Sequence, residues 1–137
     1  MSSTPEVIAA LAEARRAEKE QALFYRALAA QAEDANDAAL AEDLNGLLAD
    51  EQHHLSRLTV RLLELDQQVE NLDQLRAGTL ELEGWRDAAT AREAAEIARY
   101  EHLLQLPLDP ETAALISGFL EIERKHASTL GGKYMEA

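Results

Sequence analysis

The tetrad Glu-x-x-His occurs twice in this chain, each time in the same frame of leucines. The copies are Glu51-x-x-His54 and Glu123-x-x-His126, and a leucine stands three residues before each Glu and four residues after each His. Residues three positions apart lie on one face of a helix, so the carboxylate and the imidazole of each copy can bind the same metal ion. The repeated motif therefore predicts two similar metal positions, one on each of two helices.

A further glutamate precedes each copy of the motif. Glu18 stands seven residues before Tyr25, and Glu93 stands seven residues before Tyr100, so the two halves of the chain match each other. Two helices that give one Glu each, with two that give Glu-x-x-His, supply the ligands of a carboxylate-bridged two-metal site in a four-helix bundle. We therefore predict a redox-active diiron centre or a related two-metal centre.

Four helices are expected to position these residues. The first begins at Ser3 or Thr4, where Ser3 and Glu6 have capping-box spacing and Pro5 suits the first helical position. Asp109 is expected to cap the fourth helix, with Pro110 at its first position. The first predicted helix runs from Ser3 or Thr4 to about Asp34. The other three run from about Asp37 to Asp66, from about Trp85 to Gln105, and from Pro110 to Gly131-Gly132.

The loop lengths predict how these helices are connected. The first and third joints are short and make antiparallel hairpins, whereas residues 67–84 are long enough to travel the length of a bundle, with a short helix of their own as one option. A long connection between the second and third helices is the ferritin-like arrangement. We expect a single all-α domain over residues 1–137, because no linker marks a second one.

The composition excludes several classes of function. A net charge of -13 over 137 residues, without a basic stripe, argues against nucleic acid as a partner. The absence of cysteine excludes disulfides, thiol catalysis, iron–sulfur clusters and Cys-ligated zinc. No apolar run reaches the length of a membrane span, and the first residues carry no signal-like core, so we expect a soluble cytoplasmic protein without a membrane partner.

The helical periodicity places acidic residues on the apolar face of all four helices. Glu18 is in phase with Leu11 and Tyr25, and Glu51 and His54 are in phase with flanking leucines. Facing carboxylates in a dry interior repel one another and are costly to bury. Two divalent cations remove that conflict, and oxygen-rich ligation with one His per metal suits iron or manganese better than structural zinc.

Some positions leave alternatives open. Glu20 is a nearby alternative to Glu18 but points away from the apolar stripe. On the third helix, Glu96 lies one turn after Glu93 on the same face. Two alternatives follow: one of the two binds metal and the other lies beside it, or both bind metal. Glu101 is off-phase and is expected to be solvated.

The remaining candidates have less specific roles. Tyr25 and Tyr100 either pack in the core or hydrogen-bond a ligand carboxylate and fix its orientation. Trp85 is expected to cover one end of the bundle. We assign four polar residues to the surface, with pairing to ligand carboxylates as the lesser option for the two arginines: His53, His102, Arg15 and Arg92.

From about Glu6 to Leu130, the chain resembles the ferritin-like superfamily, and within it the diiron domain of the rubrerythrins. The resemblance implies that Glu51 and Glu123 bridge two iron ions, with manganese as an alternative. It further implies that His54 and His126 bind one metal each and that Glu18 and Glu93 are terminal ligands. The pair Glu93 and Glu96 is similar to the rubrerythrin pattern, whereas bacterioferritins share the other spacings but use a single acidic ligand on the third helix.

The chain also departs from these families. It has no cysteine and therefore no rubredoxin-like domain, so that a separate electron donor would be needed. Only a few residues follow Leu130, where storage ferritins have a fifth helix, and this argues against a cage. We expect a homodimer or a larger homo-oligomer.

The expected function is that of an oxidoreductase that reduces hydrogen peroxide or O₂, or oxidises ferrous iron. The alternative is iron binding, storage or detoxification without specific turnover, and a lesser alternative is a metal-free structural bundle.

Overall fold

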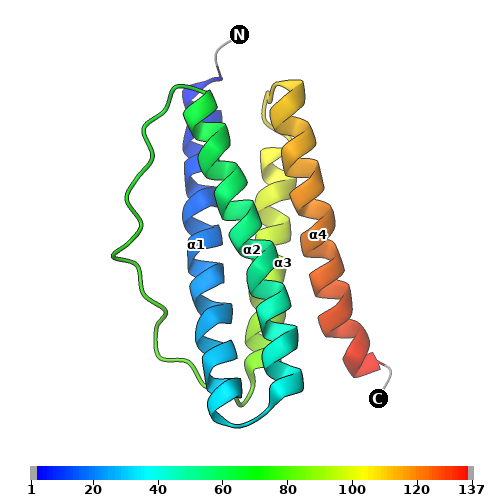
Figure 1. The fold of residues 1–137 in the computed structure, drawn as a ribbon. Coiled ribbons are helices and arrows are strands. Elements are labelled where there is room, and N and C mark those ends of the chain that lie inside the picture. Colours follow the sequence, from blue (N-terminus) through cyan, green and yellow to red (C-terminus); the bar gives the residue numbers. More distant parts are fainter. Residues whose placement is uncertain (1–2, 136–137) are drawn as a thin grey trace.

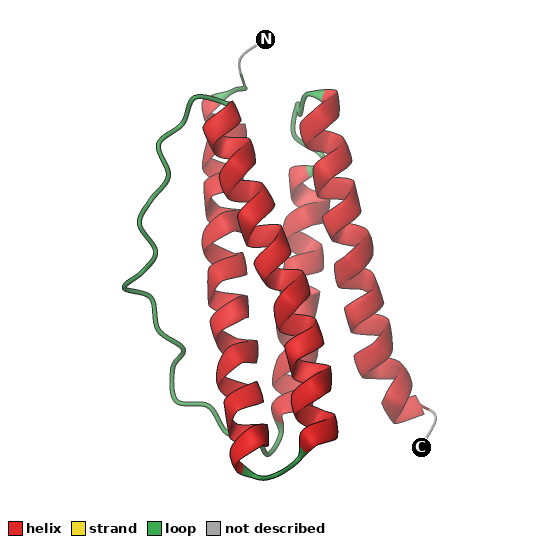
Figure 2. Cartoon of the chain, in the orientation of Figure 1, coloured by secondary structure: helices red, strands yellow, loops and turns green. Residues whose placement is uncertain are grey.

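Four long helices make up the described part of the chain (Figures 1 and 2). The computed structural model describes residues 3–135, with side chains as far as Gly131. Within these residues there is no β-strand, and the secondary structure is as follows: α1 Pro5–Asp34, α2 Ala38–Glu64, α3 Trp85–Leu103 and α4 Pro110–Met135.

Side chains cap the starts of three helices. The Thr4 hydroxyl accepts a hydrogen bond from the Val7 amide at 3.2 Å, so that Thr4 rather than Ser3 is the N-cap of α1 and the expected Ser3–Glu6 capping box is wrong. Asp37 accepts from the Leu40 amide at 3.1 Å at the start of α2. Asp109 caps α4 as predicted, as described below. These contacts satisfy amide groups that have no partner inside a helix.

The ends of the helices follow the sequence less closely. Helix α4 continues to Met135, so the predicted end at Gly131-Gly132 is wrong. A glycine commonly ends a helix by adopting a left-handed conformation, with a positive φ. In the described residues Gly84, just before α3, is the only glycine with such a φ, at 76°. Residues 131 and 132 keep helical geometry.

Residues 65–84 form the long connection between α2 and α3. This segment runs beside α1 from one end of the bundle to the other (Figure 1) and contains no helix, contrary to one of the two options above. The Arg15 guanidinium donates to the Glu70 carbonyl at 2.8 Å, and the Gln31 amide donates to the Leu80 carbonyl at 2.9 Å. The connection makes α2 and α3 parallel, while α1–α2 and α3–α4 are antiparallel hairpins.

Two apolar clusters fill the interior on either side of the acidic residues. The first includes Phe24, Leu28 and Leu44, and the second includes Leu11 and Leu58, together with residues of α3 and α4 in each case. Along every helix the inward glutamates stand between the two clusters. The apolar packing thereby fixes the middle of the bundle as the place where the polar side chains meet.

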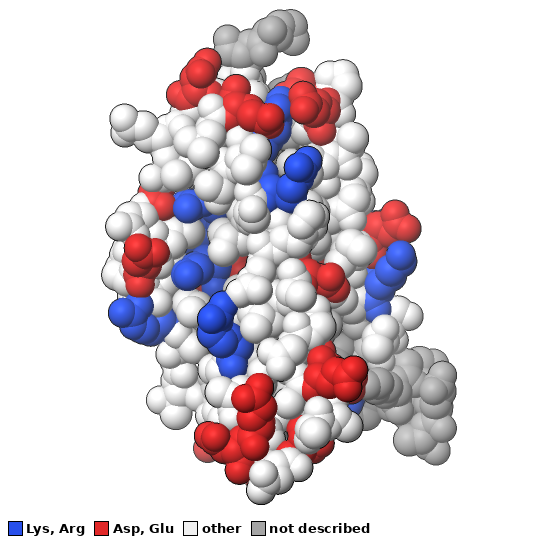
Figure 3. All heavy atoms as spheres, in the orientation of Figure 1, with Lys and Arg blue, Asp and Glu red and all other residues white. Residues whose placement is uncertain are grey.

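The surface is mixed in charge. On the face drawn in Figure 3, acidic and basic side chains alternate over the middle of the bundle, and acidic groups gather toward its two ends. None of the helices in residues 3–135 combines the length and the apolar character of a membrane span.

Candidate metal centre

All seven side chains predicted to bind metal lie in the interior, where none is more than 7% exposed. One comes from α1, two from α2, two from α3 and two from α4: Glu18, Glu51, His54, Glu93, Glu96, Glu123 and His126. Glu20 and Glu101 are exposed, as are His53 and His102. The inward face that the periodicity predicts is therefore the face that the bundle buries.

Six of the seven form two overlapping sets of four. One set is Glu18, Glu51, His54 and Glu123, and the other replaces Glu18 and His54 with Glu93 and His126. Within each set, one ligand atom per residue lies within 4.8 Å of the others. Because Glu51 and Glu123 belong to both sets, they stand between the two positions, where bridging carboxylates would lie.

Buried polar atoms without hydrogen-bond partners point into these sets. They include Nδ1 of both histidines, both carboxylate oxygens of Glu51 and Glu123, and Oε2 of Glu18 and Glu93. Nδ1 of His126 lies 3.1 Å from Glu123 Oε1, and Nδ1 of His54 lies 3.5 Å from Glu18 Oε2. Unpartnered buried polar atoms are costly and rare, so their convergence fits the donor set of two cations.

The two tyrosines connect the halves of the site crosswise. The Tyr100 hydroxyl of α3 donates to Glu18 Oε1 on α1 at 2.7 Å, and the Tyr25 hydroxyl of α1 donates to Glu93 Oε1 on α3 at 2.6 Å. Burial, together with the neighbouring glutamates, raises the pKa of both hydroxyls, so they remain protonated donors. Each tyrosine thus holds one oxygen of a candidate terminal ligand and leaves the other oxygen facing the site.

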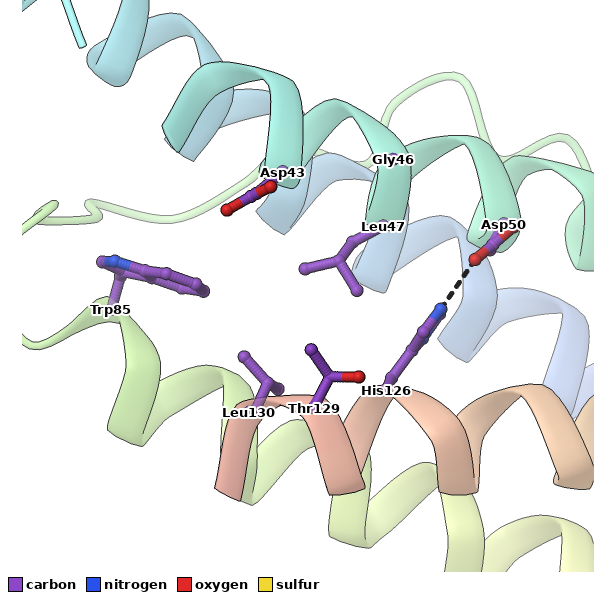
Figure 4. Close-up of a pocket in the computed structure, with 8 residues that line it drawn as sticks. All are labelled: Asp43, Gly46, Leu47, Asp50, Trp85, His126, Thr129 and Leu130. Atoms are coloured by element: carbon purple, nitrogen blue, oxygen red, sulfur yellow. Dashed lines mark hydrogen bonds and ion pairs between the residues drawn. The ribbon is translucent and has the colours of Figure 1, made fainter. Parts of the chain in front are cut away.

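Three further polar residues contact the candidate ligands, and these contacts were not predicted from the sequence. The Gln21 amide donates to Glu93 Oε1 at 3.2 Å, Asp50 Oδ2 lies 2.7 Å from His126 Nε2, and Arg99 donates to Glu96 Oε1 at 2.6 Å. Figure 4 shows the Asp50–His126 contact, which leaves Nδ1 of the ring for the site. Arg99 lies three residues after its partner Glu96, so helical spacing could have suggested that contact, whereas the Asp50–His126 contact joins two distant helices and spacing could not suggest it.

Glu96 lies beside the two sets of four and belongs to neither. It is 4% exposed and its Oε2 has no hydrogen-bond partner. Burial raises the pKa of Glu96 to about 10, with a further contribution from Glu18. Of the two carboxylates that the sequence offered on α3, Glu93 is the one placed with His126.

Arg15 and Arg92, the two arginines considered from the sequence, do not pair with a candidate ligand. Arg15 binds Thr59 and the connection, as described above. The Arg92 guanidinium lies 4.3 Å from the ring centroid of Phe24 and donates to the Gln21 side chain at 3.5 Å. Trp85 packs, partly buried, against the apolar cluster of Phe24 and Leu28, as a residue that covers the end of the bundle does.

The electrostatics of the metal-free site are strongly perturbed. Burial, and to a lesser extent repulsion from other glutamates, raises the pKa of Glu51. Burial also raises the pKa of Glu18 to about 7 and raises the pKa of Glu123 above its usual value. Burial lowers the pKa of His54. For His126 burial also acts to lower the pKa, but the nearby carboxylates of Glu123, Glu93 and Asp50 outweigh it and raise the pKa to about 10. Without cations the site must hold protons to limit its negative charge.

Solved structures with the same architecture support this description of the fold. The chain has the ferritin-like fold. Bacterioferritin BfrA of Mycobacterium tuberculosis superposes with a TM-score of 0.82 at 22% identity, over 96% of this chain and 86% of that one. A second structure of the same protein gives a TM-score of 0.85 at 21% identity, over 98% and 86% of the two chains.

A bacterioferritin from another organism matches equally well. The bacterioferritin of Desulfovibrio desulfuricans gives a TM-score of 0.85 at 22% identity, over 93% of this chain and 77% of that one, and its diiron site has been described in different catalytic states. No protein-family model and no curated protein sequence matches the chain. At these identities the likeness establishes the all-α ferritin-like four-helix bundle, with its long connection between α2 and α3.

Proposed function

We propose that this chain binds two iron ions at the centre of its bundle and takes part in iron handling, by oxidising ferrous iron and retaining the ferric product. The observation that carries the proposal is the pair of four-residue sets that share Glu51 and Glu123, with unpartnered ligand atoms facing inward. The likeness to bacterioferritins, one of them with a described diiron site, favours iron handling over the rubrerythrin-like reading of the sequence.

The donor set favours iron or manganese. Each set offers three carboxylates and one imidazole, and the four glutamates of the two sets together match the charge of two divalent cations. Oxygen-rich ligands with one nitrogen suit Fe²⁺ and Mn²⁺, whereas structural zinc sites rely on thiolates and imidazoles. The likeness to a bacterioferritin with a described diiron site favours iron over manganese.

The reaction would consume ferrous iron as substrate. Two bound ferrous ions give up one electron each, and dioxygen or hydrogen peroxide accepts the pair. Glu51 and Glu123 would serve both ions, and the two tyrosines hold the outer candidate ligands Glu18 and Glu93 so that one oxygen of each faces the site. The apolar clusters above and below limit the access of water to the site.

A second candidate is rubrerythrin-like reduction of hydrogen peroxide or O₂ with electrons from a separate donor. Glu96 favours it, because this additional buried carboxylate has one oxygen without a partner beside the ligands of α3. The chain has no cysteine to carry a relay of its own. Catalysis would then continue for many turnovers when peroxide and a reductant are supplied.

Anaerobic titration of the metal-free protein with ferrous iron tests the first proposal. We expect two ions per chain, and one ion for either His54→Ala or His126→Ala. The matched control is His53→Ala, which removes an exposed imidazole and should leave two. A parent protein that binds no iron, or the same stoichiometry in all four proteins, would refute the site.

A second measurement separates the two functions. Iron handling predicts oxidation of added ferrous iron with retention of the ferric product, in an assembly whose mass is found by light scattering. Peroxide reduction predicts continued turnover with a small-molecule reductant and a large loss of rate in Glu96→Gln. Elemental analysis of the purified protein identifies manganese if that is the native metal.

A further inference from the structure

The two halves of the candidate metal centre contain the same kinds of ligand but differ in the residues that hold those ligands. We call the half with Glu93 and His126 the His126 half, and the half with Glu18 and His54 the His54 half. Both halves share the two remaining glutamates of the site. A difference in metal binding between the halves must therefore come from the neighbours of the ligands.

A carboxylate fixes the imidazole ring of the His126 half. Oδ2 of Asp50 lies 2.7 Å from Nε2 of His126 (Figure 4). The ionised carboxylate accepts this hydrogen bond, so the proton of the neutral ring is on Nε2. The lone pair is then on Nδ1, the atom that faces the candidate site without a hydrogen-bond partner. Asp50 thus selects the tautomer and the orientation that a metal ion needs.

The imidazole ring of the His54 half has no such partner. Within the described residues, the polar contacts of His54 are those of Nδ1 with Glu18 and Glu51. The position that matches Asp50, directly before the Glu of the second Glu-x-x-His motif, is occupied by Ile122. Ile122 lines a cavity of about 450 Å³ together with His54, but its side chain cannot accept a hydrogen bond.

Only an aromatic contact restrains the His54 ring on this side. The ring of Phe119 lies 4.2 Å from the His54 ring, measured between centroids, at an angle of 31°. Such a contact limits the rotation of the imidazole but does not decide which of its nitrogens carries the proton. The ring of the His54 half is therefore less well prepared for a metal ion than the ring of the His126 half.

The outer carboxylates of the two halves differ in the same direction. Each accepts a tyrosine hydroxyl, but Glu93 also accepts the Gln21 amide at 3.2 Å. Gln21 stands three residues after Glu18, and the matching residue three positions after Glu93 is Glu96. An amide is a permanent donor, whereas a second carboxylate beside Glu18 is not. Two donors thus hold Glu93 in place, and Glu18 lacks the second one.

We propose that the two halves bind metal unequally, so that the His126 half retains its ion and the His54 half is the position at which ferrous iron exchanges. Asp50 is the positioning residue that creates most of this difference, and it acts through the ring of His126. Ligands that are already ordered lose less freedom when a cation binds. Partners of this kind change metal affinity by about tenfold to a hundredfold. The proposal rests on the proposed function and gives the two ions separate roles.

Affinities for a single ion test the proposal without interference between two bound ions. The full-length His54→Ala variant keeps only the His126 half, and the His126→Ala variant keeps only the His54 half. Titration of both metal-free proteins with Co²⁺, followed optically, should give an affinity about tenfold or more higher in His54→Ala. The Co²⁺ complex of His54→Ala should also lose its metal to excess chelator more slowly.

Variants at Asp50 separate positioning from simple charge attraction. In the His54→Ala protein, Asp50→Ala should weaken Co²⁺ binding by about tenfold or more. Asp50→Asn keeps an oxygen that can accept from Nε2 of His126, and it should retain most of the affinity. In the His126→Ala protein, both changes should alter the affinity by less than about twofold, because the ring that Asp50 holds is absent.

Transfer of the carboxylate to the other half is the converse experiment. In the His126→Ala protein, Ile122→Asp should raise the Co²⁺ affinity of the His54 half by about tenfold. Ser117→Asp is the matched control, because it adds the same charge at an exposed position of α4 and should have little effect. The Asp50 side chain is 50% exposed, so its variants should fold and decide the proposal even if Ile122→Asp does not fold.

Three results would overturn the proposal and leave the two-metal site intact. The first is equal Co²⁺ affinity of the two halves, and the second is a higher affinity of the His54 half. The third is an equal loss in Asp50→Asn and Asp50→Ala, because Asp50 would then act through its charge alone. Failure of the parent protein to bind any metal would instead refute the proposed function itself.

Discussion

The side chains of the site divide between those that could contact a metal and those that orient them. Glu18 and Glu93 each use one oxygen to accept a tyrosine hydroxyl and keep the other without a protein partner. His126 uses Nε2 for Asp50 and keeps Nδ1 for the site. Half of each ligand is thereby fixed in place, which lowers the cost of ordering it when a cation binds.

Removing either tyrosine hydroxyl should therefore weaken one metal position more than the other. Tyr100→Phe frees Glu18 and should reduce affinity at the position of His54, whereas Tyr25→Phe frees Glu93 and should reduce affinity at the position of His126. We expect losses of about tenfold to a hundredfold at the affected position. Stepwise titration with Co²⁺ and optical detection measures both affinities.

Double variants check this assignment. When His54 is replaced by Ala, a further Tyr100→Phe change should matter little and Tyr25→Phe should reduce the remaining affinity. Equal effects of the two tyrosines on both positions would mean that they act on the bundle as a whole.

The sequence predicted which side chains would face inward but not all of their partners. Glu18 was chosen over Glu20 from its phase with Leu11 and Tyr25, and burial agrees. Gln21 was not identified because its partner, Glu93, comes from a distant helix. Periodicity along one helix determines its buried face, whereas contacts between helices depend on their relative rotation and height, which periodicity does not contain.

At the level of the helices, the Asp109 cap and the two proline positions were predicted correctly, whereas the Ser3–Glu6 capping box and the glycine end signal were not. Pro5 and Pro110 stand at the first positions of α1 and α4 as expected. The Gly131-Gly132 pair does not end α4, because a glycine permits the left-handed conformation without requiring it. The ends of α2 and α3 fall two residues before the predicted ones, at Glu64 and Leu103.

Asp109 combines a cap with a contact between helices. Its carboxylate accepts hydrogen bonds from the Thr112 amide and hydroxyl, both at 2.9 Å, and from Arg61 of α2 at 3.2 Å. The Thr112 amide outweighs the opposing effect of burial and, with the Thr112 hydroxyl and Arg61, lowers the pKa of Asp109. Its contribution to stability is present above the unfolded pKa and is lost as pH falls through the folded pKa.

Asp109→Ala should therefore lower the free energy of unfolding by about 1–2 kcal/mol. Asp37→Ala is the matched control, because Asp37 caps α2 through one amide. It should cost about 1 kcal/mol or less. Urea denaturation of the metal-free proteins measures both values, and an Asp109 variant no less stable than the Asp37 variant would show that the contact with Arg61 contributes nothing.

For the molecule as a whole, the buried acids make stability depend on protons or on metal. In the metal-free protein, burial raises the pKa of Glu18 to about 7 and that of Glu96 to about 10. The unfolded chain binds no proton at these groups near neutral pH, so raising the pH removes protons that only the folded state holds. Stability is therefore lost as pH rises from the unfolded value through each folded pKa.

The metal-free protein should consequently become less stable between about pH 6.5 and pH 9. Proton loss from His126, with a pKa raised to about 10, acts in the same direction, and His54, with a lowered pKa, is neutral throughout. Protein loaded with two metal ions should melt at a higher temperature, with a weaker dependence on pH. Circular dichroism melts with and without metal measure this, and a metal-free protein whose melting temperature rises over this range would contradict it.

The crosswise tyrosines also show how the two halves of the chain depend on each other. Because the hydroxyl in each half reaches the carboxylate of the opposite half, a symmetric pair of identical two-helix units would contain both tyrosine–carboxylate contacts of the centre. Joining two such units through residues 65–84 frees them to change separately. Asp50, which contacts His126, and Ile122, at the matching position of the other half, are one place where the two halves differ.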